Sequence, residues 1–285
     1  MKIRSLENVP IEDIHRAFTR AFSDYVEPFN LTVKQLQHTL QRCGYRDYLS
    51  FAALSEGEIV GFTLNGSGQW NGKSTVYDTG TGVQKSHRKQ GIASQIFEVS
   101  LPVLKAHGIS QYLLEVIKAN TKAVDLYRKF GFLITREFDY WACPGDALRV
   151  QSGPLPEGIT IRPLEDPDWS LLCRFWDFQP SWQNSVDSIT RVRSSISILG
   201  AFYNDVPVAY FCMEEGTGDI PQMAVRPEFR HQGLAVVLLE QITHLLNPPE
   251  IRFTNTCLDS QPTRNFLLNL GLEPGHGQYE MILEF

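Results

Sequence analysis

The chain has 285 residues, of which 42% are hydrophobic, and this is enough for two cores of ordinary domain size. No run of about 18 apolar residues is present to span a bilayer, and the first residues lack the basic-then-apolar order of a secretion signal. We therefore expect a cytoplasmic protein with no membrane partner. The formal net charge of −6 argues against nucleic-acid binding, which needs a basic face to neutralise phosphates.

The five cysteines are scattered along the chain and never form a CxxC or CxH pattern. Such spacings are typical of structural zinc sites and of redox motifs. We expect reduced thiols and no metal site.

The beginning of the chain recurs in its second half. The string IRSLE at residues 3–7 returns as IRPLE at 161–165, and each copy precedes a pattern of apolar residues that predicts an amphipathic helix. The apolar positions are Ile11, Ile14, Phe18 and Phe22 in the first copy, and Trp169, Leu172, Phe175 and Trp176 in the second. The pattern of the chain thus restarts near residue 160.

Further segments repeat in the same order. Residues 51–64 and 200–213 both predict a hairpin with a polar turn, and RKQGIA at 88–93 recurs as RHQGLA at 230–235. The offset between copies shrinks along the chain, as it does in duplicated domains with loop deletions, whereas a short-period repeat array keeps its spacing. We predict an N-terminal domain over residues 1–142, a Pro- and Gly-rich linker over 143–158 and a C-terminal domain over 159–285.

In the first half, the expected elements run strand, two helices, hairpin, strand, helix, strand, helix and a final pair of strands. The Asn71-Gly72 turn signal predicts that a strand ending near residue 70 pairs with residues 75–83. This order predicts an α/β (mixed α+β) fold, with a mixed sheet flanked by helices in each domain.

The segment from Val83 to Ala93 runs from a strand end through a basic loop into an amphipathic helix. Unpaired backbone N–H groups at a helix start, together with the small residue Gly91, form a site where a pyrophosphate can approach closely. The Arg-x-x-Gly-x-Ala string is weak evidence alone, but it occurs twice, each time between a strand and a helix. The duplication makes coincidence the poorer explanation.

This loop resembles the signature of the GNAT (GCN5-related N-acetyltransferase) superfamily, Gln/Arg-x-x-Gly-x-Gly/Ala at the start of the central helix. The segment LLEVIKANTKAVDLYRKFGF at residues 113–132 is similar to the next strand and helix of that family. The resemblance covers nearly all of residues 1–141, and the tandem arrangement resembles two-domain members such as mycothiol synthases. It implies two GNAT-like domains with mostly antiparallel sheets and acetyl-CoA as co-substrate.

The resemblance also assigns cofactor-binding residues. Val83 and Lys85 would offer backbone groups to the pantetheine arm, Asn120 would contact the pantetheine or thioester region, and Tyr127 would lie beside the sulfur. The N–H groups that would wrap the pyrophosphate belong to Arg88, Lys89, Gln90, Gly91, Ile92, Ala93 and Ser94. Asn120 is also expected to be the N-cap of its helix.

Tyr127 is the expected general acid, although a tyrosine on an apolar helix face is often only part of a core. A phenol has an ordinary pKa of about 10, so it stays protonated at neutral pH and can protonate the departing CoA thiolate. Because an ammonium group cannot attack a thioester, a proton acceptor is also needed. The candidates are Glu115, Asp78, or water or the substrate alone.

The second half departs from this pattern, since Leu267 and Ser260 stand where the first half has Tyr127 and Asn120. A leucine cannot donate a proton. The loop at residues 226–235 is retained, so this domain either binds CoA or only inherits the loop. We expect it to be structural or to shape the substrate site.

The sequence therefore predicts an N-acetyltransferase that transfers an acetyl group from acetyl-CoA to a primary amine by direct attack in a ternary complex. The acceptor would be a small amine or a peptide N-terminus, with Tyr25 as a candidate contact. The alternative is a non-catalytic acyl-CoA-binding or regulatory protein. The chain could be a monomer or a homodimer.

Overall fold

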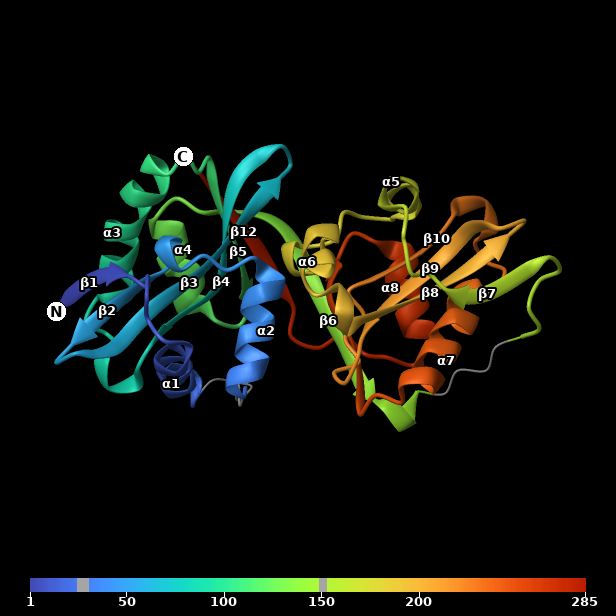
Figure 1. The fold of residues 1–285 in the computed structure, drawn as a ribbon, viewed down its shortest axis with the longest axis horizontal. Coiled ribbons are helices and arrows are strands. Elements are labelled where there is room, and N and C mark those ends of the chain that lie inside the picture. Colours follow the sequence, from blue (N-terminus) through green and yellow to red (C-terminus); the bar gives the residue numbers. More distant parts are fainter. Residues whose placement is uncertain (25–30, 149–152) are drawn as a thin grey trace. The chain divides into compact units, whose positions relative to one another are not determined.

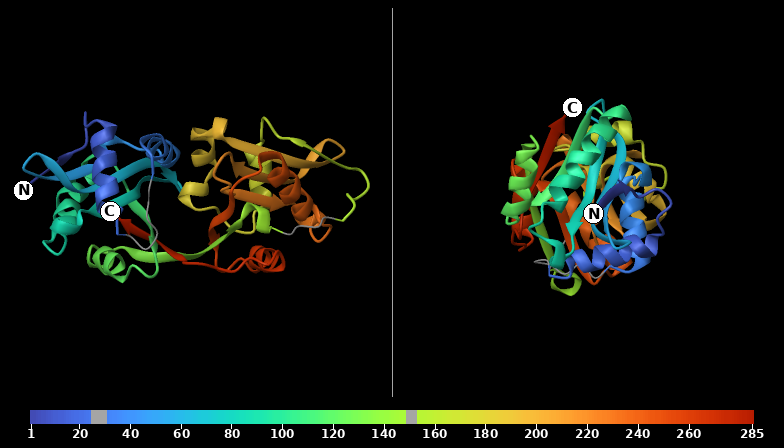
Figure 2. Two further views of the ribbon diagram at one scale, coloured as in Figure 1. Left: turned by 90° about the horizontal axis from the view of Figure 1, so that it is seen from below. Right: turned by 90° about the vertical axis from the view of Figure 1, so that its left-hand side faces the viewer.

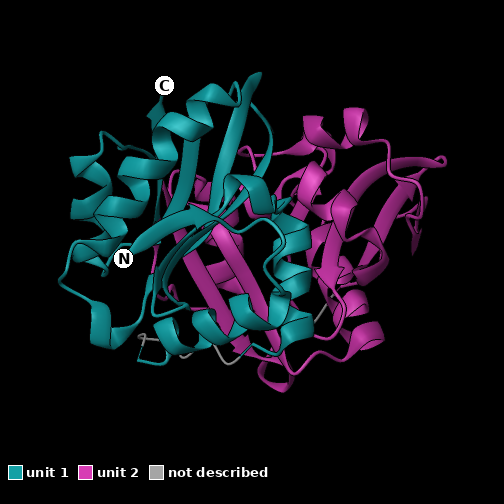
Figure 3. Cartoon of the chain, turned by 60° about the vertical axis from the view of Figure 1, so that its left-hand side comes forward, with its two compact units in different colours: residues 1–135, 279–285 teal, residues 136–278 magenta. Residues whose placement is uncertain are grey.

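The computed structural model describes residues 1–24, 31–148 and 153–285. It divides into two compact units, shown in Figure 3: unit 1 contains residues 1–135 and 279–285, and unit 2 contains residues 136–278. Both are mixed α/β structures with helices against a sheet, which confirms the predicted fold class. Each unit is described separately below.

Unit 1 is built on a sheet with the hydrogen-bonded order β1-β2-β3-β4-β5-β12, followed by the first residues of β6. Its strands are β1 (Lys2–Ser5), β2 (Phe51–Ser55), β3 (Glu58–Trp70), β4 (Lys73–Val83), β5 (Gln111–Ile117) and β12 (Gln278–Glu284). Its helices are α1 (Ile11–Phe22), α2 (Val33–Cys43), α3 (Ile92–Ala106) and α4 (Thr121–Lys129). The strands β1 to β4 pair in antiparallel order and β4 pairs with β5 in parallel.

The two faces of this sheet carry separate cores. The helices α1 and α2 cover one face, where Phe18 and Leu36 pack against Phe62. The helices α3 and α4 cover the other, where Phe97 and Tyr127 pack against the side chains of β5. Figures 1 and 2 show these two pairs of helices on opposite sides of the strands. Residues on the α3 and α4 face will matter for the site.

The last strand of the chain belongs to unit 1. In Figure 1, β12 lies as a red strand beside β5, and the N–H of Phe285 donates to the carbonyl of Ser110 over 3.0 Å. The sequence had placed this segment in the second domain, because the second repeat continues to the end of the chain. The structure differs because β12 completes the sheet of unit 1, while β6 (Leu133–Pro144) runs on into unit 2.

Unit 2 repeats the plan with an interrupted sheet. A four-stranded antiparallel sheet has the order β10-β9-β8-β7, and the later part of β6 pairs with β11. The strands are β7 (Ile159–Pro163), β8 (Ile196–Tyr203), β9 (Val206–Glu214), β10 (Gln222–Val225) and β11 (Glu250–Cys257), and the helices are α5 (Trp169–Leu172), α6 (Val186–Arg191), α7 (Leu234–Leu246) and α8 (Gln261–Asn269). The helices α7 and α8 pack with Trp141 over the core of this unit.

Both predicted hairpins are confirmed. The strands β2 and β3 turn at Glu56-Gly57, β8 and β9 turn at Asn204-Asp205, and the Asn71-Gly72 turn pairs Trp70 with Lys73. The amphipathic helix expected over residues 169–176 is only the single turn α5, followed by a 3-10 turn at Cys173–Phe175. Similarly, the predicted linker at 143–158 begins inside β6, which continues to Pro144.

Because β12 belongs to unit 1, a substitution near the C-terminus should destabilise unit 1 rather than unit 2. Met281, near the C-terminus, is fully buried in the core of unit 1. Replacing it with alanine should destabilise unit 1 by about 2–5 kcal/mol, because a buried side chain is lost and a cavity remains. Hydrogen exchange should become faster in unit 1 peptides. The matched variant Met213→Ala removes a side chain that is buried in unit 2, and it should accelerate hydrogen exchange in unit 2 peptides. Faster hydrogen exchange in unit 2 for Met281→Ala, or in unit 1 for Met213→Ala, would contradict the placement of β12 in unit 1.

Candidate active site

The strands β4 and β5 part in the middle of unit 1. Their parallel pairing runs from Thr75 opposite Gln111 to Asp78 opposite Leu114 and ends there, although β4 continues to Val83 and β5 to Ile117. Where two parallel strands stop pairing, the backbone groups on their facing edges are no longer hydrogen-bonded to each other. Asp78 stands at the apex of this opening.

Asp78 and Tyr127 meet on the α3 and α4 face. The Tyr127 hydroxyl donates to Oδ2 of Asp78 over 3.5 Å, and the Thr81 hydroxyl donates to the same oxygen over 2.7 Å. The Tyr127 ring is held edge-on by Phe97, with 5.8 Å between centroids, and packs on Phe132. Both Asp78 and Tyr127 are buried, with 6% and 7% of their surface exposed. The structure therefore brings two of the predicted catalytic residues together.

The Asp78 carboxyl is set up to exchange a proton near neutral pH. Burial raises its pKa from 3.8 to about 6, and hydrogen bonds from Thr81, the Gly80 backbone and Tyr127 only partly oppose this effect. Among the described residues, no donor reaches its Oδ1 atom. A buried carboxyl with an available oxygen and a pKa near the working pH is suited to accept a proton.

Glu115 lies on the other face of the sheet. Because side chains alternate along a strand, Glu115 shares the face of Tyr77 and Leu113 rather than that of Asp78. Its Oε2 atom accepts a hydrogen bond from the Tyr77 hydroxyl over 3.0 Å. The two candidate proton acceptors thus lie on different faces of the sheet, and Asp78 accepts the hydrogen bond from Tyr127 at 3.5 Å.

The loop between β4 and α3 has the backbone of an anion site. Lys89 and Gly91 adopt positive φ values of 64° and 73°, and Gly91 is the N-cap of α3. Within the described parts of the chain, the backbone N–H groups of residues 89–94 find no hydrogen-bond partner. Apart from its chain neighbours and the backbone of its own helix, the nearest atom that a Cβ at Gly91 would meet is Nε2 of Gln95, at 3.8 Å. This open space beside free donors suits a phosphate group.

Arg88 has a different role from that of its neighbours. Its guanidinium donates to the carbonyls of Val83 and Ala21 over 3.1 and 2.7 Å and pairs with both oxygens of Asp24 at 2.9 and 2.7 Å. The hydrogen bond from Arg88 lowers the pKa of Asp24. The backbone N–H of Arg88 donates to the carbonyl of Lys85. Arg88 therefore ties the loop to the end of α1, a contact that the sequence motif did not reveal.

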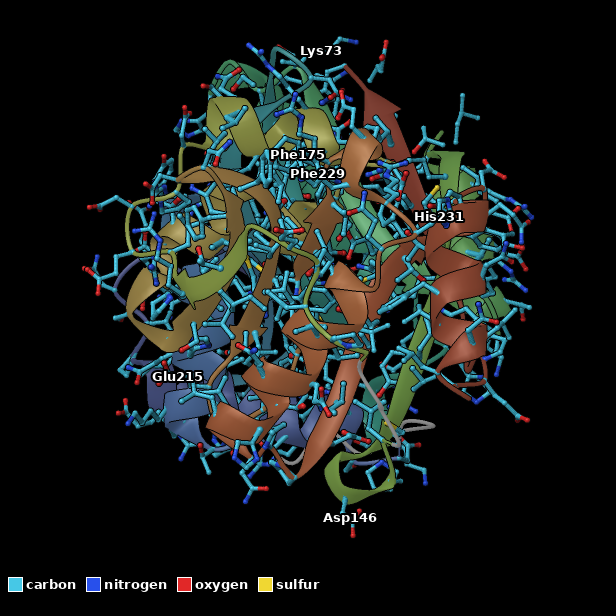
Figure 4. All side chains as sticks on the ribbon, turned by 90° about the vertical axis from the view of Figure 1, so that its right-hand side faces the viewer. Lys73, Asp146, Phe175, Glu215, Phe229 and His231 are labelled. Carbon is cyan, nitrogen blue, oxygen red and sulfur yellow. The ribbon has the colours of Figure 1, made fainter. Side chains whose placement is uncertain are left out.

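The same construction occurs in unit 2. Arg230 donates to the carbonyls of Val225 and Phe175, each over 3.0 Å, and pairs with Asp177 at 2.8 Å. His231 and Gly233 have positive φ values of 61° and 80°, close to those in the first loop. Figure 4 labels His231 on this loop and Phe175. The retained loop expected from the sequence thus has retained backbone geometry as well.

The apex chemistry is missing in unit 2. Leu267, in the position of Tyr127, is fully buried, and so it belongs to the core. Gln222 pairs with Cys212 in unit 2 in the register in which Gly80 pairs with Leu64 in unit 1. Asp78 lies two residues before Gly80, so its counterpart in unit 2 is Ile220, two residues before Gln222. A pocket in this region of unit 2 is lined mainly by uncharged residues, among them Trp176, Gln222, Asn255, Thr256 and Thr263, and its one carboxylate, Asp177, is paired with Arg230.

The remaining predicted residues border the opening or the loop. Val83 ends β4, Lys85 begins the 3-10 turn that follows, and Ile92, Ala93 and Ser94 form the first turn of α3. The Asn120 side chain accepts from the N–H of Ala123 over 3.3 Å, and so it is the N-cap of α4. Tyr25 lies outside the described residues.

Two further searches of the described residues concern metals and membranes. Across residues 1–24, 31–148 and 153–285 no group of three or more His, Cys, Asp or Glu side chains could hold a metal ion. In that same part of the chain, none of the helices combines the length and the apolar character needed to cross a bilayer.

A family model connects this geometry to known proteins. The model described as "Acetyltransferase (GNAT) family" matches residues 11–132 and again residues 160–272. The chain belongs to the GNAT acetyltransferase family. The two matches coincide with the two repeats.

Sequence relatives of this GNAT protein match only parts of it. Thialysine N-ε-acetyltransferase of Bos taurus is 33% identical over 87 residues, which are 30% of this chain and 51% of that protein. N-alpha-acetyltransferase 30 of Dictyostelium discoideum is 25% identical over 53% of this chain and 80% of its own length. Mycothiol acetyltransferase of Thermobispora bispora is 30% identical over 40% and 39% of the two chains. The first relatives are thus matched over about half their length.

Solved structures match the whole GNAT tandem. A tandem GNAT protein from the clavulanic acid biosynthesis pathway superposes with a TM-score of 0.77 over 99% of this chain and 98% of its own, at 14% identity. A GCN5-related N-acetyltransferase from Sphaerobacter thermophilus has a TM-score of 0.76 over 99% and 95%, at 16% identity. At these identities the likeness concerns the fold, and it confirms the tandem arrangement.

Proposed function

We propose that the chain is an acetyl-CoA-dependent N-acetyltransferase that acetylates a primary amine by direct attack in a ternary complex within unit 1. The observation that carries this proposal is the contact between Tyr127 and Asp78 at the point where β4 and β5 part. A proton donor and a proton acceptor are what the transfer of an acyl group to an amine requires. Acetyl transfer itself is the chemistry of the family.

Unit 1 offers suitable groups for acetyl-CoA. The N–H groups of residues 89–94 and the open space at Gly91 fit the pyrophosphate, and the edge of β4 beyond Asp78, which does not pair with β5, fits the amides of the pantetheine arm. Lys85 and Asn120 complete the predicted binding set. When bound, acetyl-CoA supplies an activated acyl carbon and a thiolate leaving group.

Tyr127 is the proposed general acid. Its hydroxyl can give a proton to the departing sulfur, after which the neutral thiol leaves. Phe97 and Phe132 fix the ring in place, so that little conformational freedom remains to be lost when the reactants bind.

Asp78 is the proposed proton acceptor. Its Oδ1 atom takes the proton that the attacking nitrogen must lose, either directly or through a water molecule. Glu115 remains the second candidate, because it lies on the next strand across the opening, with Tyr77 as a hydrogen-bond partner. Asp78 is favoured since it accepts a hydrogen bond from Tyr127.

The acceptor class follows from the relatives rather than from the geometry. One is named for acetylating thialysine at its ε-amine and another for acetylating α-amines. We propose a small amine or a peptide N-terminus as the acceptor.

Two-substrate kinetics test the proposal. Initial rates would be measured with acetyl-CoA against free lysine, thialysine, a polyamine, an amino sugar and peptides with a free N-terminus. We expect at least one amine to be acetylated, with double-reciprocal lines that intersect as a ternary complex requires. Parallel lines would contradict direct attack. Tight acetyl-CoA binding without turnover of any amine would instead support a non-catalytic acyl-CoA-binding protein.

A further inference from the structure

We propose that a chain of buried hydroxyls behind Asp78, formed by Thr81, Thr63 and Tyr112 and ending at the Asn65 amide, positions this carboxylate for proton transfer. The proposal rests on the proposed role of Asp78 as proton acceptor. These side chains do not face the reacting atoms, so they are positioning residues rather than catalytic ones. The hydroxyl chain lies on the α3 and α4 face of unit 1.

The hydroxyl chain is continuous. The Thr81 hydroxyl lies 2.7 Å from Oδ2 of Asp78 and 3.0 Å from the Thr63 hydroxyl. Thr63 in turn lies 3.1 Å from the Tyr112 hydroxyl and 3.3 Å from Oδ1 of Asn65. Tyr112 donates to that same Asn65 oxygen over 2.6 Å. Thr63, Asn65 and Tyr112 are fully buried, so water does not compete for these hydrogen bonds.

One end of the hydroxyl chain has a fixed polarity. Nδ2 of Asn65 donates to the carbonyl of Leu49 over 2.6 Å, and the Asn65 N–H donates to Ser50 over 2.8 Å. The amide oxygen must therefore point towards Tyr112 as an acceptor. A buried amide in the reverse orientation would face the Leu49 carbonyl with its own oxygen, which is unfavourable.

The hydroxyl chain can serve both protonation states of Asp78. When the carboxyl is ionised, the single proton of Thr81 points to Oδ2. When Oδ1 has taken the proton, Oδ2 remains the carbonyl oxygen of the neutral acid and still accepts from Thr81, so the hydrogen bonds between Thr81, Thr63 and Tyr112 persist. No group of the hydroxyl chain has to reorient. A polar group that is already oriented adds little reorganisation to the transfer.

The phenols of Tyr127, from α4, and Tyr112, from β5, face Asp78, whereas Tyr77 on its own strand points to the other face of the sheet, towards Glu115. Burial raises the pKa of Tyr112 and of Tyr77 well above 10. These two groups stay neutral across the pH range in which Asp78 titrates. A change in its titration after a change in the hydroxyl chain is therefore not caused by a neighbouring charge.

Unit 2 provides an internal comparison. Phe211 pairs with Met223 in the register in which Thr63 pairs with Thr81 in unit 1. Asn65 lies two residues after Thr63, and its counterpart, two residues after Phe211, is Met213. All three replacements are apolar, and Phe211 and Met213 are fully buried. The unit that lacks the acid and the carboxylate thus also lacks the hydroxyl chain. A purely structural network would have no reason to be lost together with them.

The test is the titration of Asp78 in the variant Thr81→Val. Two readouts report it: the NMR signal of the Asp78 carboxyl carbon and the pH dependence of kcat/KM. Losing the donor to the ionised form should raise the Asp78 pKa by about one pH unit, and the acidic limb of the rate profile should move with it. Thr81→Ser should restore both values. Thr79→Val is the matched control, because no described residue hydrogen-bonds to the buried Thr79 hydroxyl.

The outcomes separate the two proposals. A titration of Asp78 in Thr81→Val that equals that of the wild type and of Thr79→Val would overturn the role of the hydroxyl chain. If the carboxyl titration shifts but the rate profile does not, the hydroxyl chain still tunes Asp78, and the role of Asp78 as proton acceptor is what fails. An equal shift in Thr79→Val would show a nonspecific change of packing and would also count against the hydroxyl chain.

Discussion

Replacing Tyr127 with phenylalanine is expected to lower kcat by roughly 10²- to 10⁴-fold, which is the usual contribution of a general acid. The departing thiolate would then have to leave without a positioned proton donor. Phenylalanine keeps the ring that packs between Phe97 and Phe132. The fold and acetyl-CoA binding should therefore be retained. Initial rates with the best amine of the panel, together with a titration of acetyl-CoA, measure both quantities.

Tyr279→Phe is the matched control for this variant. Tyr279 packs at the edge of the same core, and its ring lies 5.4 Å from the Lys118 ammonium rather than at the apex of the opening. Its removal should leave kcat unchanged. An unchanged kcat in Tyr127→Phe would mean that the phenol only packs in the core, which is the alternative that the amphipathic pattern left open.

Replacing Asp78 with asparagine is expected to have a comparable effect on the rate and a distinct effect on its pH dependence. Burial raises the pKa of Asp78 to about 6, and a proton acceptor works only when it is ionised. In the wild type, kcat/KM should therefore rise with pH through about 6 and then level off. The asparagine variant should lose this limb and roughly 10²- to 10⁴-fold in rate.

The raised pKa of Asp78 also predicts that the lower rate of Asp78→Asn is not caused by unfolding. An ordinary aspartate ionises at 3.8 and the buried one at about 6, so ionisation weakens the fold as pH rises between these values. The difference corresponds to about 3 kcal/mol at pH 8. Asp78→Asn stays neutral and should resist denaturant at least as well as the wild type at that pH. A much less stable variant would contradict the sign of this effect.

Glu115→Gln distinguishes the two candidate acceptors. Its Oε2 atom accepts from Tyr77 on the other face of the sheet, and a glutamine oxygen can accept the same hydrogen bond. If Asp78 is the acceptor, this variant should keep the acidic limb of the profile. A limb lost in Glu115→Gln and kept in Asp78→Asn would reassign the proton transfer.

Local patterns predicted much of the fold. The turn signals at Glu56-Gly57, Asn71-Gly72 and Asn204-Asp205 each lie in a hairpin of the structure. The glycines that precede α3 and α7 adopt the positive φ that the loop motif requires. These features depend on residues close together in the chain, and so they can be read directly from the sequence.

Features that depend on distant residues could not be predicted. Met281 lies in the core of unit 1 although it follows the second repeat, because strand order is decided by pairing across the sheet. The sequence likewise left Asp78 and Glu115 equivalent, since only the register of β4 with β5 places them on opposite faces. The contact between Arg88 and Asp24 needs the end of α1 to lie beside the loop.

The most direct test of a catalytic unit 1 is kcat/KM for acetyl-CoA in Gly91→Glu and Gly233→Glu. Each variant places a carboxylate, with the same backbone strain, in a loop of nearly identical geometry. We expect Gly91→Glu to abolish acetyl transfer and Gly233→Glu to change it by no more than about twofold. Transfer that survives Gly91→Glu, or that only Gly233→Glu removes, would place the active site in unit 2.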